Sequence, residues 1–428
     1  MKFIGTLTTF ILVILLVSCD RSQKIPAEIL KEYPSSMVLQ VTNEGNFNRT
    51  DEVITLKTDE LLRKYPDFNP QAVVIFDKGV ELPSQLLDSH ADGKSDQLKC
   101  IADFSASETK KIVIQYSPQG VKPRSYPKRT QAELSHKING EFQKNKAGRF
   151  EYIGGTFKNV DYLRVPPQHT DHSFFIRYEG PGWESDKVGY RFYLDWRNAS
   201  DIFGKKTSEM VLQKVGLDGF DSYHLMSDWG MDILKVGEAL GIGAVGMFQD
   251  GKVERVSKTD GVTCRIVANG PVYSHIRTSY FGWLLGDMKF DLISDLSICA
   301  GSRITQHTVK IAGNPPNLCT GIVKQEGISL LQNPEDDGEW GYLATYGQQS
   351  LAGDTLGMAV LFRKNDLIEI TEDTYNWVAV LKPVDGHLNY HFLAAWEQEP
   401  GGIKTEQQFK DYLNETIWKL NHPLKIVM

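Results

Sequence analysis

Short segments in which apolar and polar residues alternate recur along this chain, and this period of two most constrains what it can fold into. Alternation places successive side chains on opposite faces of a β-strand. In the clearest segment, residues 187–197, the apolar face carries Val188, Tyr190, Phe192, Leu194 and Trp196. The other face carries Gly189, Arg191, Tyr193, Asp195 and Arg197. We therefore predict a strand with one core face and one charged face that bears a phenol.

The surrounding stretch, residues 172–205, is typical of two strands joined by a loop. Glycine and proline make the loop, residues 180–186, a turn, yet it also carries Trp183 and Glu184, which no turn requires. An aromatic platform beside planar hydrogen-bonding groups suits a sugar, because the apolar sugar face stacks and the hydroxyls take paired hydrogen bonds. A solvated sheet face with cross-strand ion pairs is the structural alternative. The pattern favours a carbohydrate site.

Similar strands throughout the chain predict a mainly β fold. With 428 residues the chain is long enough for two domains. We expect an N-terminal β-sandwich over residues 20–120 and a large β-rich domain over residues 150–428 that carries the site. One helix is expected in the first domain, at residues 59–65 with Thr58 as its N-cap.

A basic segment, residues 121–149, separates the two predicted domains. Within it, Leu134, Ile138 and Phe142 are spaced as one face of an amphipathic helix over residues 130–142. We predict a solvated linker containing this helix, with contact to an acidic polymer as the alternative.

The N-terminus resembles that of a bacterial lipoprotein. Lys2 precedes an apolar run, residues 3–17, that is too short to span a membrane and ends in Leu-Val-Ser-Cys. This ending resembles a lipobox, in which Cys19 becomes the lipidated first residue of the mature chain. We expect a signal peptide over residues 1–19, a lipid anchor that holds the protein on a membrane, and a location in the periplasm or at the outer membrane or cell surface. An ordinary signal peptide is the alternative.

Charge and cysteine content exclude several classes. The net charge of −7 argues against nucleic acid as a partner, although a local arginine cluster can still bind an acidic ligand. The four remaining cysteines, Cys100, Cys264, Cys299 and Cys319, are widely spaced and follow no zinc pattern. In an exported protein they could form disulfides, but the strand-like apolar surroundings of Cys264 and Cys299 favour buried free thiols. No metal and no cofactor is predicted.

A second dense stretch, residues 220–246, places polar and aromatic residues on a glycine-rich loop, as binding sites do. Tyr223, His224, Trp229 and Asp232 are its candidate site residues. Asp232 together with Asp228 is also a sparse candidate for a hard cation.

The segments RYEGPGWESDKVGYRFYLDWRNASDIFGK, YHLMSDWGMD, LKVGEALGIGA and GVELPSQLLD together resemble a family of secreted or lipid-anchored proteins of polysaccharide-degrading bacteria. That family was long of unknown function and includes an oligosaccharide dehydratase of ulvan breakdown. The resemblance covers most of the mature chain. It implies a galactose-mutarotase-like β-supersandwich for the large domain and an acidic oligosaccharide as substrate.

The chemistry implied is removal of water from a non-reducing-end uronic acid, by loss of the C5 proton and the C4 hydroxyl. The chemistry itself requires a cation on the carboxylate, a base at C5 and an acid at the leaving oxygen. We assign the cation to Arg191, with Arg197 as second choice, because the guanidinium fork binds a carboxylate in two places. His224 and Tyr193 are assigned as base and acid in either order, with His172 in reserve. The expected sugar contacts are Trp183, Glu184, Asp195, Arg197, Tyr223, Trp229 and Asp232.

Two other classes stay open. A glycoside hydrolase needs two carboxylates on opposite sides of one sugar, and the hairpin supplies several. A non-catalytic glycan-binding lipoprotein would use the same residues for affinity alone. The oligomeric state, the sugar and its linkage are left open by the sequence.

Overall fold

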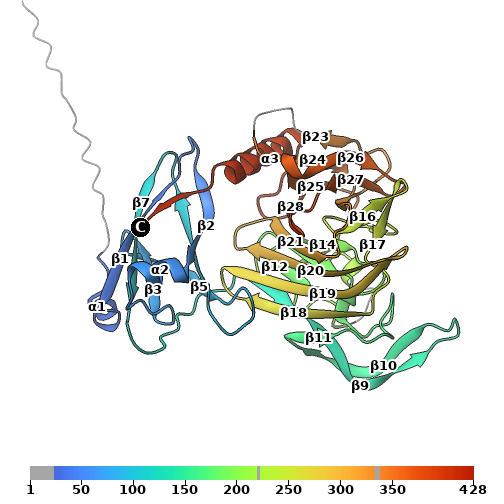
Figure 1. The fold of residues 1–428 in the computed structure, drawn as a ribbon, viewed down its shortest axis with the longest axis horizontal. Coiled ribbons are helices and arrows are strands. Elements are labelled where there is room, and N and C mark those ends of the chain that lie inside the picture. The colour runs from blue at the N-terminus through green and yellow to red at the C-terminus, as the bar shows by residue number, and fades with distance from the viewer. Residues whose placement is uncertain (1–23, 219–221, 333–337) are drawn as a thin grey trace, which may run out of the picture.

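The computed structural model describes residues 24–218, 222–332 and 338–428. Antiparallel sheets make up most of these residues, which confirms the mainly β, β-sandwich-type prediction (Figure 1). No helix in the described part of the chain is long and apolar enough to cross a membrane. The predicted signal peptide and Cys19 lie outside the described residues.

The N-terminal unit is a sandwich of two sheets around a shared apolar core. The first sheet has the order β29 (Lys425–Val427), β1 (Ser35–Thr42), β7 (Thr109–Tyr116), β3 (Val73–Asp77) and β4 (Val80–Leu82). The second has the order β2 (Arg49–Lys57), β6 (Gln97–Phe104) and β5 (Ser84–Leu87). Because β29 pairs with β1, the end of the chain returns to this sandwich (Figure 1). The predicted domain boundaries stay predictions, but the N-terminal unit includes this last strand.

The α-helices among the described residues are few. They are α1 (Ala27–Glu32), α2 (Thr58–Lys64) and α3 (Glu406–Asn421). The predicted helix at residues 59–65 is thus confirmed as α2, but the cap is wrong. Thr58 is the first helical residue, and its hydroxyl donates to the carbonyl of Ser95 instead of capping the helix.

The described part of the larger unit contains three large sheets and a two-stranded ribbon. A nine-stranded sheet has the order β11 (Tyr162–Arg164), β18 (Gly261–Asn269), β19 (Tyr273–Leu285), β20 (Met288–Cys299), β21 (Ile304–Ala312), β28 (His387–Trp396), β25 (Thr355–Arg363), β24 (Trp340–Gln348) and β23 (Leu330–Gln332). A five-stranded sheet has the order β15 (Gly230–Asp232), β14 (Ser200–Lys205), β13 (Val188–Phe192), β12 (Gly182–Ser185) and β8 (Thr130–Glu133). Another has the order β17 (Lys252–Arg255), β16 (Gly246–Gln249), β22 (Leu318–Val323), β27 (Asn376–Leu381) and β26 (Leu367–Glu372).

One apolar cluster joins these three sheets into a single core. Trp183 and Tyr190 of the β12–β13 hairpin stack at a centroid distance of 5.6 Å, and both pack against Phe392 of the nine-stranded sheet. Helix α3 covers the outer face of β24 and β25 through Phe409, Leu413 and neighbouring apolar residues. The hairpin is therefore sandwiched inside the unit, which explains why both faces of β13 are buried.

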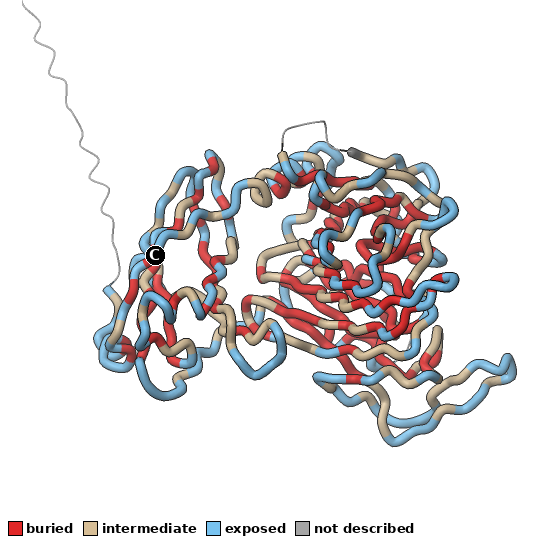
Figure 2. Tube along the Cα trace, viewed as in Figure 1, coloured by how far each residue is buried: buried red, intermediate tan, exposed pale blue. Residues whose placement is uncertain are grey.

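A two-stranded ribbon, β9 (Ser135–Lys144) and β10 (Phe150–Asn159), projects from the larger unit (Figure 1) and is largely exposed or half-buried (Figure 2). The predicted helix at residues 130–142 is wrong, because β8 and β9 occupy this segment. Residues four apart share a face in a strand as well as in a helix, so Leu134, Ile138 and Phe142 satisfied both patterns. Phe142 packs edge-on against Tyr152 of β10, 5.0 Å away.

Candidate functional site

Arg191 lies at the centre of a buried polar network instead of facing a ligand. Its side chain is only 2% exposed. Nη2 donates to Asp201 at 2.7 Å and to Asp232 at 2.6 Å, so one guanidinium joins strands β13, β14 and β15. Nη1 donates to the phenol oxygen of Tyr223 at 3.0 Å. The prediction that Arg191 binds the substrate carboxylate is therefore wrong for this conformation, since a buried cation needs its internal partners.

Tyr193 is likewise buried. Its hydroxyl donates to Asp201 at 2.6 Å, and its ring lies under the guanidinium of Arg197 at 4.0 Å. Burial raises the pKa of Tyr193 well above its usual value, so the phenol stays neutral. A catalytic role in contact with substrate is wrong for Tyr193 as the residues lie, because the phenol and its proton acceptor are both enclosed.

Trp183 and Glu184 also belong to the interior, and their assignment as sugar contacts is wrong. The loop predicted at residues 180–186 contains strand β12, which carries both residues into the core. The indole of Trp183 donates to Thr305 at 2.8 Å. Glu184 accepts from Lys205 at 2.6 Å and from the backbone N–H groups of Val211 and Leu212.

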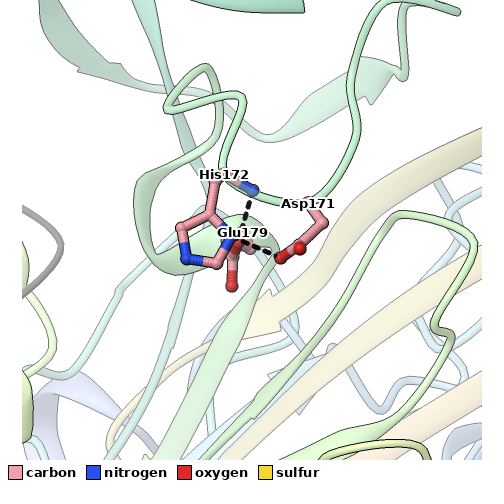
Figure 3. Close-up of side chains that lie close together, drawn as sticks. All are labelled: Asp171, His172 and Glu179. Atoms are coloured by element: carbon pink, nitrogen blue, oxygen red, sulfur yellow. Dashed lines mark hydrogen bonds and ion pairs between the residues drawn. The ribbon is translucent and has the colours of Figure 1, made fainter. Parts of the chain in front are cut away.

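Asp195 and Arg197 form the outer part of the network. Arg197 contacts Asp195 at 2.5 Å, Glu179 at 3.0 Å and Asp171 at 2.8 Å. His172 contacts both Asp171 and Glu179 (Figure 3). Its Nδ1 lies 2.7 Å from Asp171, and its backbone N–H donates to Glu179 at 3.0 Å. Asp171, His172 and Glu179 offer ligand atoms within 4.8 Å of one another. Since the Arg197 guanidinium already contacts both carboxylates, it supplies the positive charge at this position.

The loop before β15 brings the second dense stretch to the same network. Asp232 lies 3.4 Å from Nε2 of His224 and is fully buried, whereas the His224 side chain is 31% exposed. The rings of Tyr223 and His224 lie 4.5 Å apart, and Trp229 packs at the edge of the same apolar cluster. Burial and the neighbouring Asp201 raise the pKa of Asp232. The structure therefore brings together Arg191, Tyr193, Tyr223, His224 and Asp232 through direct contacts.

A cavity of about 510 Å³ opens beside this network, a size that suits a small ligand. Tyr223 and Glu179 border it directly, and both belong to the network described above. Other parts of the wall come from Lys137 and Phe157 of the projecting ribbon, from Phe174 and Tyr178 of the loop before β12, and from residues 216–218. Half-buried aromatic rings beside a cation, a phenol and a carboxylate are the composition of a polar small-molecule site.

The loop that precedes β12 is backbone-strained where it meets this cavity. The predicted strand at residues 172–179 is wrong, because four of its non-glycine residues adopt left-handed φ angles. These are His172 (58°), Phe174 (57°), Tyr178 (38°) and Glu179 (71°). Such conformations cost free energy and concentrate at functional sites. Three of the four border the cavity, which marks it as the candidate site.

Glu179 and Tyr223, which both border the cavity, have opposite pKa shifts. Burial alone would raise the pKa of Glu179, but Arg197, Arg191 and the N–H of His172 together lower it below its usual value. Burial raises the pKa of Tyr223 despite the adjacent Arg191. At neutral pH the cavity therefore presents an ionised carboxylate and a neutral phenol.

Sequence reasoning missed Lys137, Phe157, Phe174 and Tyr178 as site residues. Lys137 lies in residues 121–149, which were predicted to be a solvated linker, so it was not considered as a site residue. The sequence signal available was the clustering of Phe, Tyr and Lys on an alternating pattern after residue 134.

The fold and the site define a mainly β protein of sandwich type with a polar, aromatic-lined cavity in its larger unit. The chain belongs to the family described as "Domain of unknown function (DUF4861)", whose model matches residues 41–426. No curated protein matches its sequence.

Two solved structures from Enterococcus faecalis match the chain at low similarity. A protein in the glycosyl hydrolase family 38 is 9% identical with a TM-score of 0.41, over 94% of this chain and 48% of that one. An alpha-mannosidase is 11% identical with a TM-score of 0.37, over 92% of this chain and 46% of that one. The chain spans about half the length of these two proteins, and similarity at this level does not bear on its activity.

Proposed function

We propose that this chain is a carbohydrate-active lyase that removes water from a non-reducing-end uronic acid of an acidic, ulvan-type oligosaccharide, giving an unsaturated uronyl residue. One observation carries the proposal: the cavity of about 510 Å³ is bordered by a neutral phenol, an ionised carboxylate and a lysine that lies over the ring of Phe157. These groups match an acidic sugar and a reaction that must protonate a leaving hydroxyl.

The cation that binds the substrate carboxylate is Lys137. Its ammonium lies 5.5 Å from the ring centre of Phe157, so the charge and the aromatic surface stand side by side. Pairing with Lys137 makes the C5 proton more acidic, because the negative charge that develops toward the carboxylate is stabilised. Phe157 and Phe174 contact the apolar face of the sugar, and Glu179 accepts hydrogen bonds from its hydroxyls.

The acid is Tyr223 and the base is His224. His224 removes the C5 proton, the electron pair of that C–H bond forms the C4–C5 double bond, and the C4–O bond breaks. Tyr223 gives its proton to the departing oxygen, so that water leaves, and the proton held by His224 then returns to the phenolate. Asp232, 3.4 Å from His224, stabilises the imidazolium formed in the first step. His172 stays the reserve for the base.

Arg191 and Tyr193 act through other residues. Arg191 donates to the phenol oxygen of Tyr223 at 3.0 Å, so it orients that phenol and stabilises the phenolate formed when the proton leaves. Tyr193 orients Asp201 against the same guanidinium. Arg191 and Tyr193 are therefore proposed as positioning residues, instead of the residues in direct contact with substrate that the sequence predicted.

The proposal is tested with saturated uronate-ended oligosaccharides from ulvan and, for comparison, from alginate and pectate. The expected products absorb in the ultraviolet band of unsaturated uronates and have lost the mass of one water. Products that have gained water would instead establish a hydrolase, and an unchanged oligosaccharide that binds would establish a binding protein.

A hydrolase is the second candidate, favoured by one feature. Asp218 borders the same cavity as Glu179, which supplies the two carboxylates that glycoside hydrolysis requires. Replacement of Asp218 by Asn separates the two candidates, because only hydrolysis depends on it.

For the N-terminal segment we propose a lipoprotein signal with lipidation at Cys19, and so a location on a bacterial membrane facing the periplasm or the cell surface. The lipobox-like Leu-Val-Ser-Cys ending supports this. Metabolic labelling with a radioactive fatty acid should mark the natural chain and not the Cys19→Ala variant, and equal labelling of both would contradict it.

A further inference from the structure

A second cavity, of about 570 Å³, lies beside the outer part of the buried network. Its walls include Asp195 and Trp196, which follow β13, and Arg164 of β11. Arg197 pairs with Asp195, which borders this cavity, and with Glu179, which borders the first. The two cavities are therefore neighbours on either side of one guanidinium.

Trp196 gives this cavity an aromatic platform. Its side chain was expected on the core face of the strand, but the residue is 42% exposed, because the strand ends at Phe192 and the chain turns outward. The guanidinium of Arg255 lies 5.1 Å from its ring centre. An exposed indole beside a cavity suits the apolar C–H face of a sugar.

The rim of the cavity carries uncompensated positive charge. Asp195 is paired with Arg197, and Asp260 is paired with Lys289 at 2.6 Å. Arg164 and Lys258 both border the cavity and are exposed, and neither has an ion-pair partner within the described ranges. The net charge available to a ligand here is positive, although the whole chain carries −7.

Two buried side chains bordering the cavity have a polar atom that makes no more than a weak internal hydrogen bond. They are His169, through Nε2, and Tyr280, through its hydroxyl. His169 is 8% exposed and Tyr280 is 2% exposed. A ligand hydroxyl that reaches one of these atoms would gain a full hydrogen bond, because the atom is buried and weakly partnered inside the protein.

We propose that this second cavity binds an acidic saccharide unit, with Trp196 stacked on the sugar and Arg164 and Lys258 paired with its carboxylate or sulfate group. The site shares its ligand class with the proposed function but none of its catalytic residues. The proposal of this second binding site therefore applies whether the chain converts the oligosaccharide or only binds it.

The test is binding of acidic trisaccharides prepared from ulvan, alginate, pectate and chondroitin, measured by calorimetry and by saturation-transfer NMR on the full-length mature chain. Maltotriose serves as the neutral probe. We expect at least one acidic trisaccharide to bind, with affinity lowered at least tenfold by Trp196→Ala and by Arg164→Gln. Trp196→Phe should retain most of the affinity, because the ring is kept.

The matched controls are Tyr375→Ala, another exposed aromatic residue at 48%, and Arg63→Gln, an exposed arginine of α2. Neither should change binding, and Tyr223→Phe in the first cavity should leave this component of binding intact while it alters conversion. The proposal fails if no acidic trisaccharide binds, if maltotriose binds equally well, or if the Trp196 and Arg164 variants bind as the natural chain does. Failure of the chain to convert an oligosaccharide, with trisaccharide binding retained, contradicts the proposed function and supports the second binding site.

Discussion

Arg191 and Asp232 form a fully buried ion pair, with Nη2 2.6 Å from Oδ2. The same carboxylate oxygen lies 3.4 Å from His224, which is partly exposed, so the pair connects the interior of the larger unit to its surface. The Arg191 guanidinium also contacts Tyr223, which borders the first cavity. The charged face of β13 thus acts beneath the site and holds in place the groups that a ligand can touch.

Arg191→Gln should destabilise the fold strongly. The substitution removes the cation between Asp201 and Asp232 and leaves two buried carboxylates without compensation, at a cost of about 3–5 kcal/mol. Urea denaturation followed by tryptophan fluorescence measures this loss. As the matched control, Arg63→Gln removes an exposed pair with Asp59 and should change stability by less than about 1 kcal/mol. Equal stability of the two variants would contradict the central role of Arg191.

Tyr223→Phe should abolish most of the activity with little change in fold. Removal of one general acid lowers the rate by roughly a hundredfold to ten-thousandfold. The ring still packs against Phe203 at 5.9 Å, so the fold should be kept, but the melting temperature should fall modestly because Nη1 of the buried Arg191 loses the phenol oxygen as a partner. Steady-state kinetics on the accepted oligosaccharide should show the loss in kcat, and Tyr375→Phe is the matched control. A variant with full activity would remove Tyr223 from the mechanism.

The strands of the larger unit were predictable because they are long and alternate. Strand-like alternation can be read in the sequence at residues 262–267, 273–281, 288–299 and 303–311, and these segments correspond to β18, β19, β20 and β21. Strand β12 was missed, since Gly180, Pro181 and Gly182 are typical of a turn. Here the missing Cβ of Gly180 allows the close approach of this segment to the end of β13 instead.

The site was predicted only in part, for a physical reason. Arg191 and Tyr193 alternate with apolar residues, which is typical of a strand with one face in solvent. Their burial depends on a second layer of protein over that face, and layering is a tertiary property that alternation does not encode. The cysteines of the described residues are free, as predicted, but of the two expected to be buried only Cys264 is buried, whereas Cys299 is half-buried.

Gly180→Ala should prevent correct folding. A Cβ at residue 180 would lie 1.7 Å from the carbonyl oxygen of Phe192, so the contact between this loop and the end of β13 must open. That opening breaks the hydrogen bond from the Leu194 N–H to the Glu179 carbonyl, now 3.0 Å, and displaces Glu179 from the cavity. Soluble yield and near-ultraviolet circular dichroism report the effect. Gly261→Ala is the control, because its added Cβ meets nothing closer than 3.8 Å; similar behaviour of both variants would contradict the steric argument.

Acidification should destabilise the chain partly through His307, which is fully buried between Ser294 and the carbonyl of Gly243. Burial lowers its pKa from 6.5 to about 4. Between these values the unfolded chain binds a proton that the folded chain does not, so the free energy of unfolding falls as pH drops from 6.5 toward 4, by up to roughly 3 kcal/mol. The urea midpoint measured across this range should fall less steeply for His307→Gln than for the natural chain, because the variant lacks the titrating group. His387→Gln, at an exposed position, should keep the natural slope, and a slope unchanged in His307→Gln would show that other groups cause the acid sensitivity.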